Sequence, residues 1–278
     1  MSADVPKSRK PDSIRSTISP SSPSPAIPAS TALPTLYQLA LAAHGHQDWW
    51  PGDTAFEVCV GAILVQNTNW TNVERAIERL QTAGALELHG LLSVSPDQLA
   101  DLIRPAGYYN QKARRLRIFA RVVRDQYGAD LARLFDGPTA EVRRRLLALE
   151  GIGPETADSM LLYAGGHASF VVDAYTRRIF HRHGWCAADE PYDRLQALCE
   201  RFLGGGDPTR RLDYWQDYHA QLVRLGKDHC RKAAPRCEAC PVRSLLPATG
   251  PVCPRRCESH LVPGIPTATL ANHRIDPT

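Results

Sequence analysis

The chain lacks the features that would place it at or across a membrane. None of its 278 residues belongs to an apolar run long enough to span a bilayer. Its N-terminus has no apolar segment of the kind that a secretory signal needs. We therefore expect a cytoplasmic protein with no membrane partner. Organellar targeting, to which the few acids and several bases of residues 1–32 loosely point, is the weaker alternative.

Lysine is scarce, which limits the reactions in which a side-chain amine acts as the nucleophile. Five lysines occur in the whole chain: Lys7, Lys10, Lys112, Lys227 and Lys232.

β-Strand patterns are missing as well. Apolar and polar residues alternate only at 169–172, which is too short to build on, and no internal repeat occurs. Residues 1–32 are rich in Ser and Pro and are predicted to form a disordered tail. Helical spacing dominates from residue 34 onward, and the patterns at Thr71 and Ser95 are predicted to cap two of the helices. The sequence therefore predicts an all-α fold.

The net charge of +4 is mild, but the basic residues are unevenly distributed. Residues 112–124 contain six bases and no acid, interleaved with apolar side chains. A basic amphipathic helix of this kind suits a phosphate backbone. A solvated arginine face is the alternative interpretation.

Five of the eight cysteines lie between residues 230 and 257, where they indicate a metal centre rather than disulfides. The spacing Cys230-x6-Cys237-x2-Cys240 favours a [4Fe–4S] cluster, because the six-residue gap is long for zinc. Cys253 is the expected fourth ligand and Cys257 the alternative. The isolated Cys59, Cys186 and Cys199 are predicted to be small core residues.

The segment Leu149–Ala157, of sequence LEGIGPETA, has two glycines separated by one apolar residue between two helical patterns. This is typical of a helix-hairpin-helix turn, whose free N–H groups can bind a DNA phosphate. A glycine cap joining two ordinary helices is the alternative.

Several motifs in order resemble the helix-hairpin-helix DNA glycosylases of the endonuclease III superfamily. They are Gly61–Thr68 (GAILVQNT), Gly107–Ala113 (GYYNQKA), the hairpin, Val171–Arg178 (VVDAYTRR) and the cysteine segment. The resemblance implies two helical domains flanking a DNA-binding cleft into which a damaged nucleotide is flipped. It assigns 53–167 to a six-helix barrel with the hairpin, and 33–52 plus 168–229 to the second domain. Residues 230–257 form the iron–sulfur cluster loop, and 258–278 a tail.

Two departures from the family pattern concern chemistry. Where bifunctional members carry a lysine that attacks the sugar, this chain has Glu155, and a carboxylate cannot form an imine. The resemblance therefore implies a monofunctional glycosylase. Where the family has its fourth cysteine, this chain has Leu246, which places the cluster in doubt unless Cys253 replaces it.

A third departure concerns the substrate. Trp49, Trp50, Pro51 and Trp70 are similar to the base-pocket residues of the 3-methyladenine glycosylases of the endonuclease III type. An N-alkylated purine carries positive charge and stacks well on an indole. Core packing is the alternative for these tryptophans.

The resemblance assigns further roles residue by residue. Asp173, with Glu155, is the expected catalytic residue and would stabilise the oxocarbenium-like sugar, although Asp173 could also simply cap a helix. Gln66 would fill the space left by the flipped base, and Tyr108 would act as a wedge. The DNA-binding set is completed by Gly151, Ile152, Gly153 and Thr156. The expected partner is double-stranded DNA with damaged bases, bound by a monomer.

Three other functions remain open at this point. One is a bifunctional glycosylase and lyase acting on oxidised pyrimidines. Another is a mismatch glycosylase that removes thymine or adenine. The third, from a different class, is a module that binds lesions without cutting them.

Overall fold

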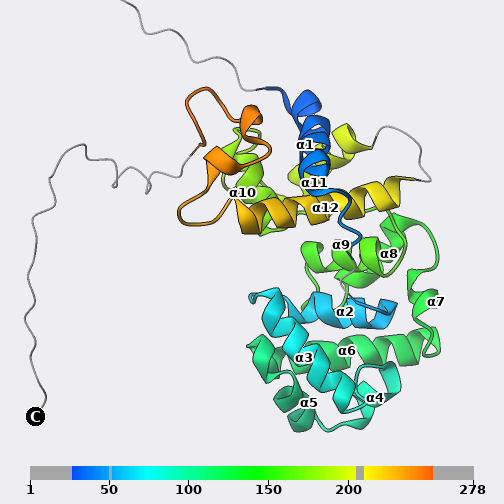
Figure 1. The fold of residues 1–278 in the computed structure, drawn as a ribbon. Helices are drawn as coiled ribbons and strands as arrows, with labels where there is room; N and C mark the ends of the chain where they lie inside the picture. Colours follow the sequence, from blue (N-terminus) through cyan, green and yellow to red (C-terminus); the bar gives the residue numbers. More distant parts are fainter. Residues whose placement is uncertain (1–26, 50–51, 205–209, 253–278) are drawn as a thin grey trace, which may run out of the picture.

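The computed structural model describes residues 27–49, 52–204 and 210–252, and these residues form helices with no β-strand among them. The prediction of an all-α fold is confirmed. Figure 1 shows the twelve α-helices of this part of the chain: α1 (Ala29–His44), α2 (Ala55–Leu64), α3 (Trp70–Thr82), α4 (Leu88–Ser93), α5 (Pro96–Leu102), α6 (Tyr109–Tyr127), α7 (Leu131–Phe135), α8 (Thr139–Leu147), α9 (Pro154–Tyr163), α10 (Ala174–Arg182), α11 (Tyr192–Leu203) and α12 (Arg211–Asp228). Short 3-10 turns occur at Arg104–Ala106, Cys237–Ala239 and Arg243–Leu245.

Local side-chain caps explain where several helices begin. Ser95 forms the predicted capping box with Gln98 at the start of α5. The prediction that Thr71 caps the next helix is wrong, because α3 begins at Trp70 and its cap is Asn69, whose side chain accepts the N–H of Asn72 at 3.0 Å. Asparagine is as good an N-cap as serine or threonine, so the chain uses the first suitable side chain.

The N-terminal boundary of the ordered chain also differs from the prediction. Helix α1 begins at Ala29, so the last four residues of the expected tail 1–32 are helical. Ala32 and Leu33 are fully buried, and burial of these apolar side chains outweighs the tail-like Ser and Thr composition around them. Residues 1–26 lie outside the described residues.

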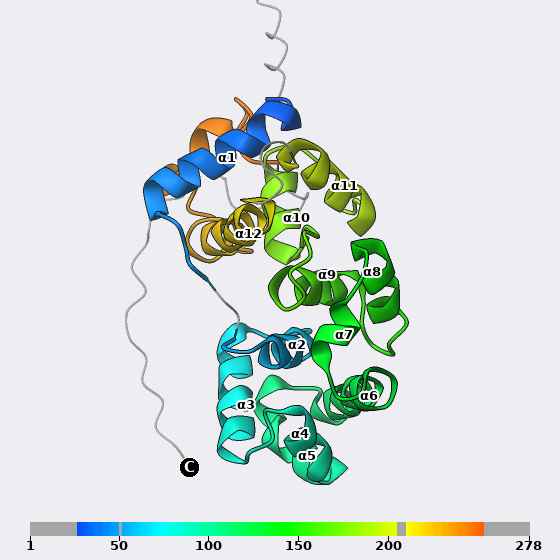
Figure 2. The same cartoon turned by 90° about the vertical axis from the view of Figure 1, so that its right-hand side faces the viewer.

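Two hydrophobic cores are formed, and they meet at α2 and α9. One core is built from residues between Cys59 and Leu161, and contains α3 to α8. The other joins α1 to α10, α11, α12 and the segment after them, as Figure 2 shows. Neighbouring residues of α2 and α9 belong to different cores: Val58 and Leu162 to the second, Cys59 and Leu161 to the first. These two helices therefore carry side chains to the boundary between the cores.

A buried ion pair fixes α9 relative to α8. Arg143 donates to both carboxylate oxygens of Asp158, at 2.9 and 3.0 Å, and the Asp158 side chain is fully buried. Ser169 adds a third hydrogen bond to Asp158. Because α9 starts at the glycine-rich turn, this pair also holds the turn in place.

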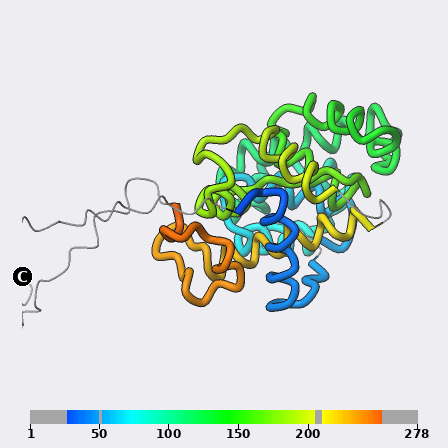
Figure 3. Tube along the Cα trace, turned by 90° about the horizontal axis from the view of Figure 1, so that it is seen from above, coloured from blue at the N-terminus to red at the C-terminus, as the bar shows by residue number. Residues whose placement is uncertain are grey.

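The segment that follows α12 is irregular and packs beside α10 and α12, as Figures 1 and 3 show. Val242 and Leu245 anchor it in the second core, and Arg178 donates to the backbone oxygen of Cys230. No helix among the described residues is long and apolar enough to cross a membrane.

Candidate functional site

A cavity of about 150 Å³ lies where the two cores meet. Its walls include apolar residues from both cores, such as Ala62 of α2 and Val171 before α10. Two carboxylates, Glu155 and Asp173, and the aromatic side chains of Trp49, Trp70, Tyr163 and Tyr175 also line it. A mostly apolar cavity with a few convergent polar groups is the usual form of a small-molecule or base site. The structure therefore brings together residues that lie far apart in the sequence.

Asp173 enters the cavity from the N-terminus of α10. Its Oδ1 accepts hydrogen bonds from the Thr176 N–H at 2.7 Å and the Thr176 hydroxyl at 2.8 Å, so it does cap the helix. Its Oδ2 lies 3.6 Å from Nε2 of His219 on α12. Burial alone would raise the pKa of Asp173, but His219 and the Thr176 hydrogen bonds outweigh burial and lower it. Asp173 is therefore an ionised carboxylate at neutral pH.

Glu155 lies in the first turn of α9, beside the glycine-rich turn. The Glu155 side chain reaches solvent, but protein atoms surround most of its carboxyl group. This partial burial raises the pKa of Glu155 to about 7, and the negative charge of Asp173 raises it further. Two neighbouring carboxylates with separated pKa values can take different roles in one reaction.

Trp49 forms one wall of the cavity. Its ring packs edge-on against Tyr163 at a centroid distance of 5.5 Å and against Trp70 at 6.2 Å. The hydroxyl of Tyr163 is hydrogen-bonded to Nδ1 of His219 at 2.7 Å, which places the imidazole between Tyr163 and Asp173. Trp50 and Pro51, the other two expected pocket residues, lie outside the described residues.

Sequence reasoning missed several residues that line this cavity, among them Tyr163, His219 and Lys227. His219 and Lys227 belong to α12, far along the chain from the recognised motifs, and nothing in the local sequence distinguishes them from ordinary helix residues. Lys227 is notable because lysines are so few. Lys112, by contrast, is buried and donates to the backbone oxygens of Leu64 and Ala106, so it is no part of the exposed basic face.

The glycine-rich turn has the geometry of a hairpin between α8 and α9. Gly151 has a φ of +83°, and a side chain there would collide with the Arg115 guanidinium that lies over it. Gly153 precedes the first residue of α9 and has open space beside it. Ile152 is buried, and its N–H is bonded to Leu149. The backbone near Gly153 is thus the accessible part of the turn.

Gln66 is bonded directly to this turn. Its amide donates to the oxygen of Gly151 at 3.0 Å and to the hydroxyl of Thr156 at 2.9 Å, while its Oε1 accepts from Arg115. The Thr156 side chain is buried, so Thr156 holds Gln66 rather than reaching outward. Arg115 was not singled out from the sequence, although it lies in the basic stretch.

Tyr108 projects from the surface, with 69% of the residue exposed. It follows Gly107 in a left-handed conformation (φ +47°) immediately before α6. An exposed aromatic held by an unusual backbone conformation has no packing role, which excludes a buried tyrosine at this position.

The three cysteines of the described C-terminal segment, Cys230, Cys237 and Cys240, line one small cavity together with Leu246. Arg182 is buried beside them and donates to Cys230 Sγ at 3.2 Å, and the N–H of Val252 donates to the oxygen of Arg182. A buried guanidinium beside sulfur suits a negatively charged thiolate set. Within residues 27–49, 52–204 and 210–252, however, no three His, Cys, Asp or Glu side chains are arranged to hold a metal ion. Cys253 lies outside these residues.

Cys59 and Cys199 are fully buried, as predicted, and Cys186 is half-buried at the edge of the second core.

Comparison with known proteins places this chain in a family. Residues 60–204 match the HhH-GPD superfamily of base excision DNA repair proteins. A Methanocaldococcus jannaschii protein provisionally named as a DNA repair glycosylase is 44% identical over 210 residues, covering 75% of this chain and 92% of that protein. Endonuclease III of Thermotoga maritima is 29% identical over 185 residues, or 66% of this chain and 79% of its own length.

Two solved structures are also similar to this chain. The Helicobacter pylori 3-methyladenine DNA glycosylase bound to 1,N6-ethenoadenine has a TM-score of 0.61 at 28% identity, covering 72% of this chain and 98% of that one. An endonuclease III–DNA complex has a TM-score of 0.66 at 22% identity, covering 79% and 95%, and at that identity shows the fold alone.

Proposed function

The chain belongs to the HhH-GPD superfamily of base excision DNA repair proteins and is a DNA N-glycosylase of the endonuclease III family, and we propose that it is a monofunctional enzyme that removes alkylated purines from double-stranded DNA. The observation that carries the proposal is the cavity itself, which two tryptophans and two carboxylates line together. The carboxylate of Glu155 occupies the first turn after the hairpin, where a lyase would carry its amine.

The cavity suits a cationic aromatic base. The flipped base stacks on Trp49 or Trp70, and the electron-rich indole faces favour the positive charge of an N-alkylated purine. The nearby carboxylates of Asp173 and Glu155 add to this preference. Likeness to a 3-methyladenine glycosylase at 28% identity supports the same substrate class.

The two carboxylates divide the chemistry. Breaking the glycosidic bond leaves positive charge on the sugar, and the ionised Asp173 stabilises it. Glu155, with its pKa raised to about 7, accepts the proton of the attacking water, because a general base works best when its pKa is near the working pH. An alkylated purine is already a good leaving group and needs no further acid.

The residues around the cavity bind the duplex through contacts that do not depend on the base sequence. The backbone near Gly153 binds a phosphate at the start of α9. Tyr108 inserts between bases beside the lesion, and Gln66, fixed to the hairpin, occupies the space left by the flipped base. The enzyme acts as a monomer, and binding weakens steeply with added salt because phosphate contacts release counterions.

The cysteine segment is proposed to hold a [4Fe–4S] cluster with a structural role. Cys230, Cys237 and Cys240 supply three ligands, and Cys253 replaces the missing cysteine at Leu246. The support is that the N–H of Val252 is bonded to Arg182, which brings the chain just before Cys253 beside the other cysteines. When bound, such a cluster ties the segment together through its thiolates. Loss of iron and acid-labile sulfide in Cys253→Ser, with both retained in Cys257→Ser, tests this ligand choice.

The proposed reaction is tested by base release from duplexes that carry 3-methyladenine, 7-methylguanine, thymine glycol, uracil or a G·T mismatch, with and without alkaline work-up. We expect release of the methylated purines and strand breaks only after alkali. Asp173→Asn is expected to abolish release while leaving DNA affinity within about twofold, because the neutral amide keeps the Thr176 cap but not the charge.

Other outcomes identify the alternatives. Breaks without alkali at thymine glycol would mean that an amine, with Lys227 the first candidate in the cavity, supplies a lyase. Release of thymine from G·T alone would indicate a mismatch enzyme. Tight binding of lesions without release at any enzyme excess would leave a non-catalytic module.

A further inference from the structure

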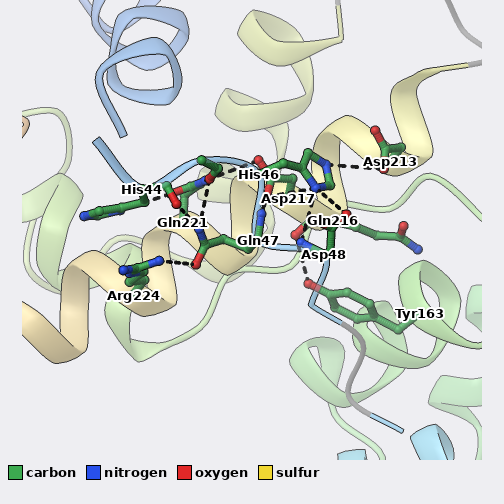
Figure 4. A network of polar contacts seen from close by, with 11 residues as sticks. His44, His46, Gln47, Asp48, Tyr163, Asp213, Gln216, Asp217, Gln221 and Arg224 are labelled. Carbon is green, nitrogen blue, oxygen red and sulfur yellow. Dashed lines mark hydrogen bonds and ion pairs between the residues drawn. The ribbon is translucent and has the colours of Figure 1, made fainter. Parts of the chain in front are cut away.

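Trp49 is delivered to the cavity by a short strap, residues 44–49, that crosses α12 (Figure 4). The strap has no secondary structure after α1 ends at His44. Side chains of α12 supply its fixed points. Gln221 donates to the oxygen of Gly45 at 2.8 Å, and Asp217 accepts the N–H of Gln47 at 2.7 Å. The backbone is therefore held on both sides of residue 46.

Asp217 is the central group of this arrangement. Its side chain is fully buried, and a buried carboxylate is costly unless its oxygens are hydrogen-bonded. One oxygen accepts from the strap at Gln47, and the other from Gln221 at 3.3 Å. The strap thus gives this buried carboxylate a hydrogen bond beyond the one from Gln221, which couples the position of the strap to the helix.

His46 links the strap to three carboxylates. Its Nδ1 lies 2.9 Å from Oδ1 of Asp48 and 3.9 Å from Asp217, and its Nε2 lies 3.5 Å from Asp213. Asp48 has a left-handed backbone (φ +44°) and directly precedes Trp49. Protonated His46 donates to the Asp48 side chain, whereas neutral His46 can instead accept the Asp48 N–H, 3.2 Å away. The protonation state of His46 therefore bears on which of these two contacts forms just before Trp49.

We propose that His46, Asp217 and Gln221 are positioning residues that hold Trp49 as the wall of the base cavity. The strap fixes the backbone two residues before Trp49, and the Trp49 ring then packs against Tyr163, which is itself bonded to the backbone of Gln216 on α12. One helix thus places both the tryptophan and the Asp173-facing imidazole. The inference rests on the proposed function in one respect, namely that Trp49 contacts the base.

The positioning is sensitive to pH, with a sign set by the surrounding charges. Burial is the largest single effect and lowers the pKa of His46, but Asp217, Asp213 and Asp48 together outweigh it and raise the pKa above 6.5. Tyr37 of α1 and Tyr163 of α9 also lie near Asp217, and both stay neutral because burial and neighbouring carboxylates raise their pKa values. Because the pKa of His46 is raised, the contribution of protonated His46 to holding the strap is complete below pH 6.5. It is lost as the pH rises through the pKa of His46 in the folded protein.

A double-mutant cycle tests the coupling in the full-length protein. Single-turnover release of 3-methyladenine is measured for Asp217→Asn, Trp49→Ala and the double variant. We expect Asp217→Asn to slow release by about three- to tenfold, and to have no further effect once Trp49 is removed. Asp193→Asn, which neutralises an exposed carboxylate of α11 whose partner is Arg143, is the control and should release base at the wild-type rate.

NMR supplies a measurement that does not depend on catalysis. The His46 imidazole, assigned with His46→Gln, should titrate above pH 6.5, and the Trp49 indole N–H, assigned with Trp49→Phe, should shift with the same midpoint. In Asp217→Asn both midpoints should fall together. If these titrations occur but no base is released from any duplex, the proposed function fails and the positioning stands. The positioning inference is overturned if base is released but the effects of Asp217→Asn and Trp49→Ala on the rate are additive. It is also overturned if the Trp49 indole N–H signal does not shift when His46 titrates.

Discussion

Glu155 provides the sharpest test of the two-carboxylate chemistry. Its pKa of about 7 means that the carboxylate is mostly protonated at pH 6 and mostly ionised at pH 8. If ionised Glu155 accepts the proton of the attacking water, the rate that depends on it rises about tenfold across this range. Glu155→Gln should be slower at pH 8 and should lose this rise, because an amide cannot ionise.

The assay is single-turnover release of 3-methyladenine at half-unit steps between pH 5.5 and 8.5. At each pH the wild-type rate is divided by the Glu155→Gln rate. The decrease in rate that we expect when His46 loses its proton affects both proteins and therefore cancels. A ratio that increases about tenfold with a midpoint near 7 supports the assignment. A ratio that stays constant with pH would refute it, since ionisation of Glu155 would then have no part in the reaction.

The same carboxylate makes a linked prediction about stability. Because the pKa of Glu155 is raised in the folded protein, its contribution to the free energy of unfolding is present below about pH 4.5. That contribution is lost as the pH rises through about 7. For a fully buried group, a pKa shift of this size corresponds to at most about 3 kcal/mol of stability. Because Glu155 is accessible to solvent, we expect about 1 kcal/mol. Glu155→Gln should therefore be more stable than wild type at pH 8 and equally stable at pH 4 in urea unfolding.

Three further predictions follow from the geometry. Glu155→Lys should give a borohydride-trapped complex with abasic DNA that the wild-type protein does not give, because only an amine forms the imine. Asp158→Ala should lower the free energy of unfolding in urea by about 3–5 kcal/mol, since it leaves Arg143 without its bidentate partner, whereas Asp193→Ala, which removes an exposed partner of the same arginine, should change it by less than about 1 kcal/mol. Tyr108→Ala should weaken binding to lesion DNA more than to undamaged duplex in fluorescence anisotropy without changing stability; equal losses on both DNAs would argue against a wedge.

Tertiary contacts explain why parts of the site escaped sequence reasoning. The roles of Lys112 and Thr156 depend on which side chains become buried, and a basic or polar residue in a helical pattern does not reveal this. Tyr163 and His219 meet only because α9 and α12 pack together across the second core. The cap at Asn69 was missed for a simpler reason, since two polar residues compete for one helix start.

The sequence by itself determined the helical fold, because apolar spacing and side-chain caps are local signals read over a few residues. It also determined the hairpin, since two glycines separated by one apolar residue between helical patterns favour a tight turn, and the absence of a lysine at Glu155, since chemistry follows residue type. Only the tertiary structure decided that Glu155 and Asp173 share one cavity and have separated pKa values, because burial and neighbouring charge arise only when α9, α10 and α12 pack together. It likewise decided the strap, because Gln47 lies 170 residues from Asp217 in the chain and meets it only in the folded protein.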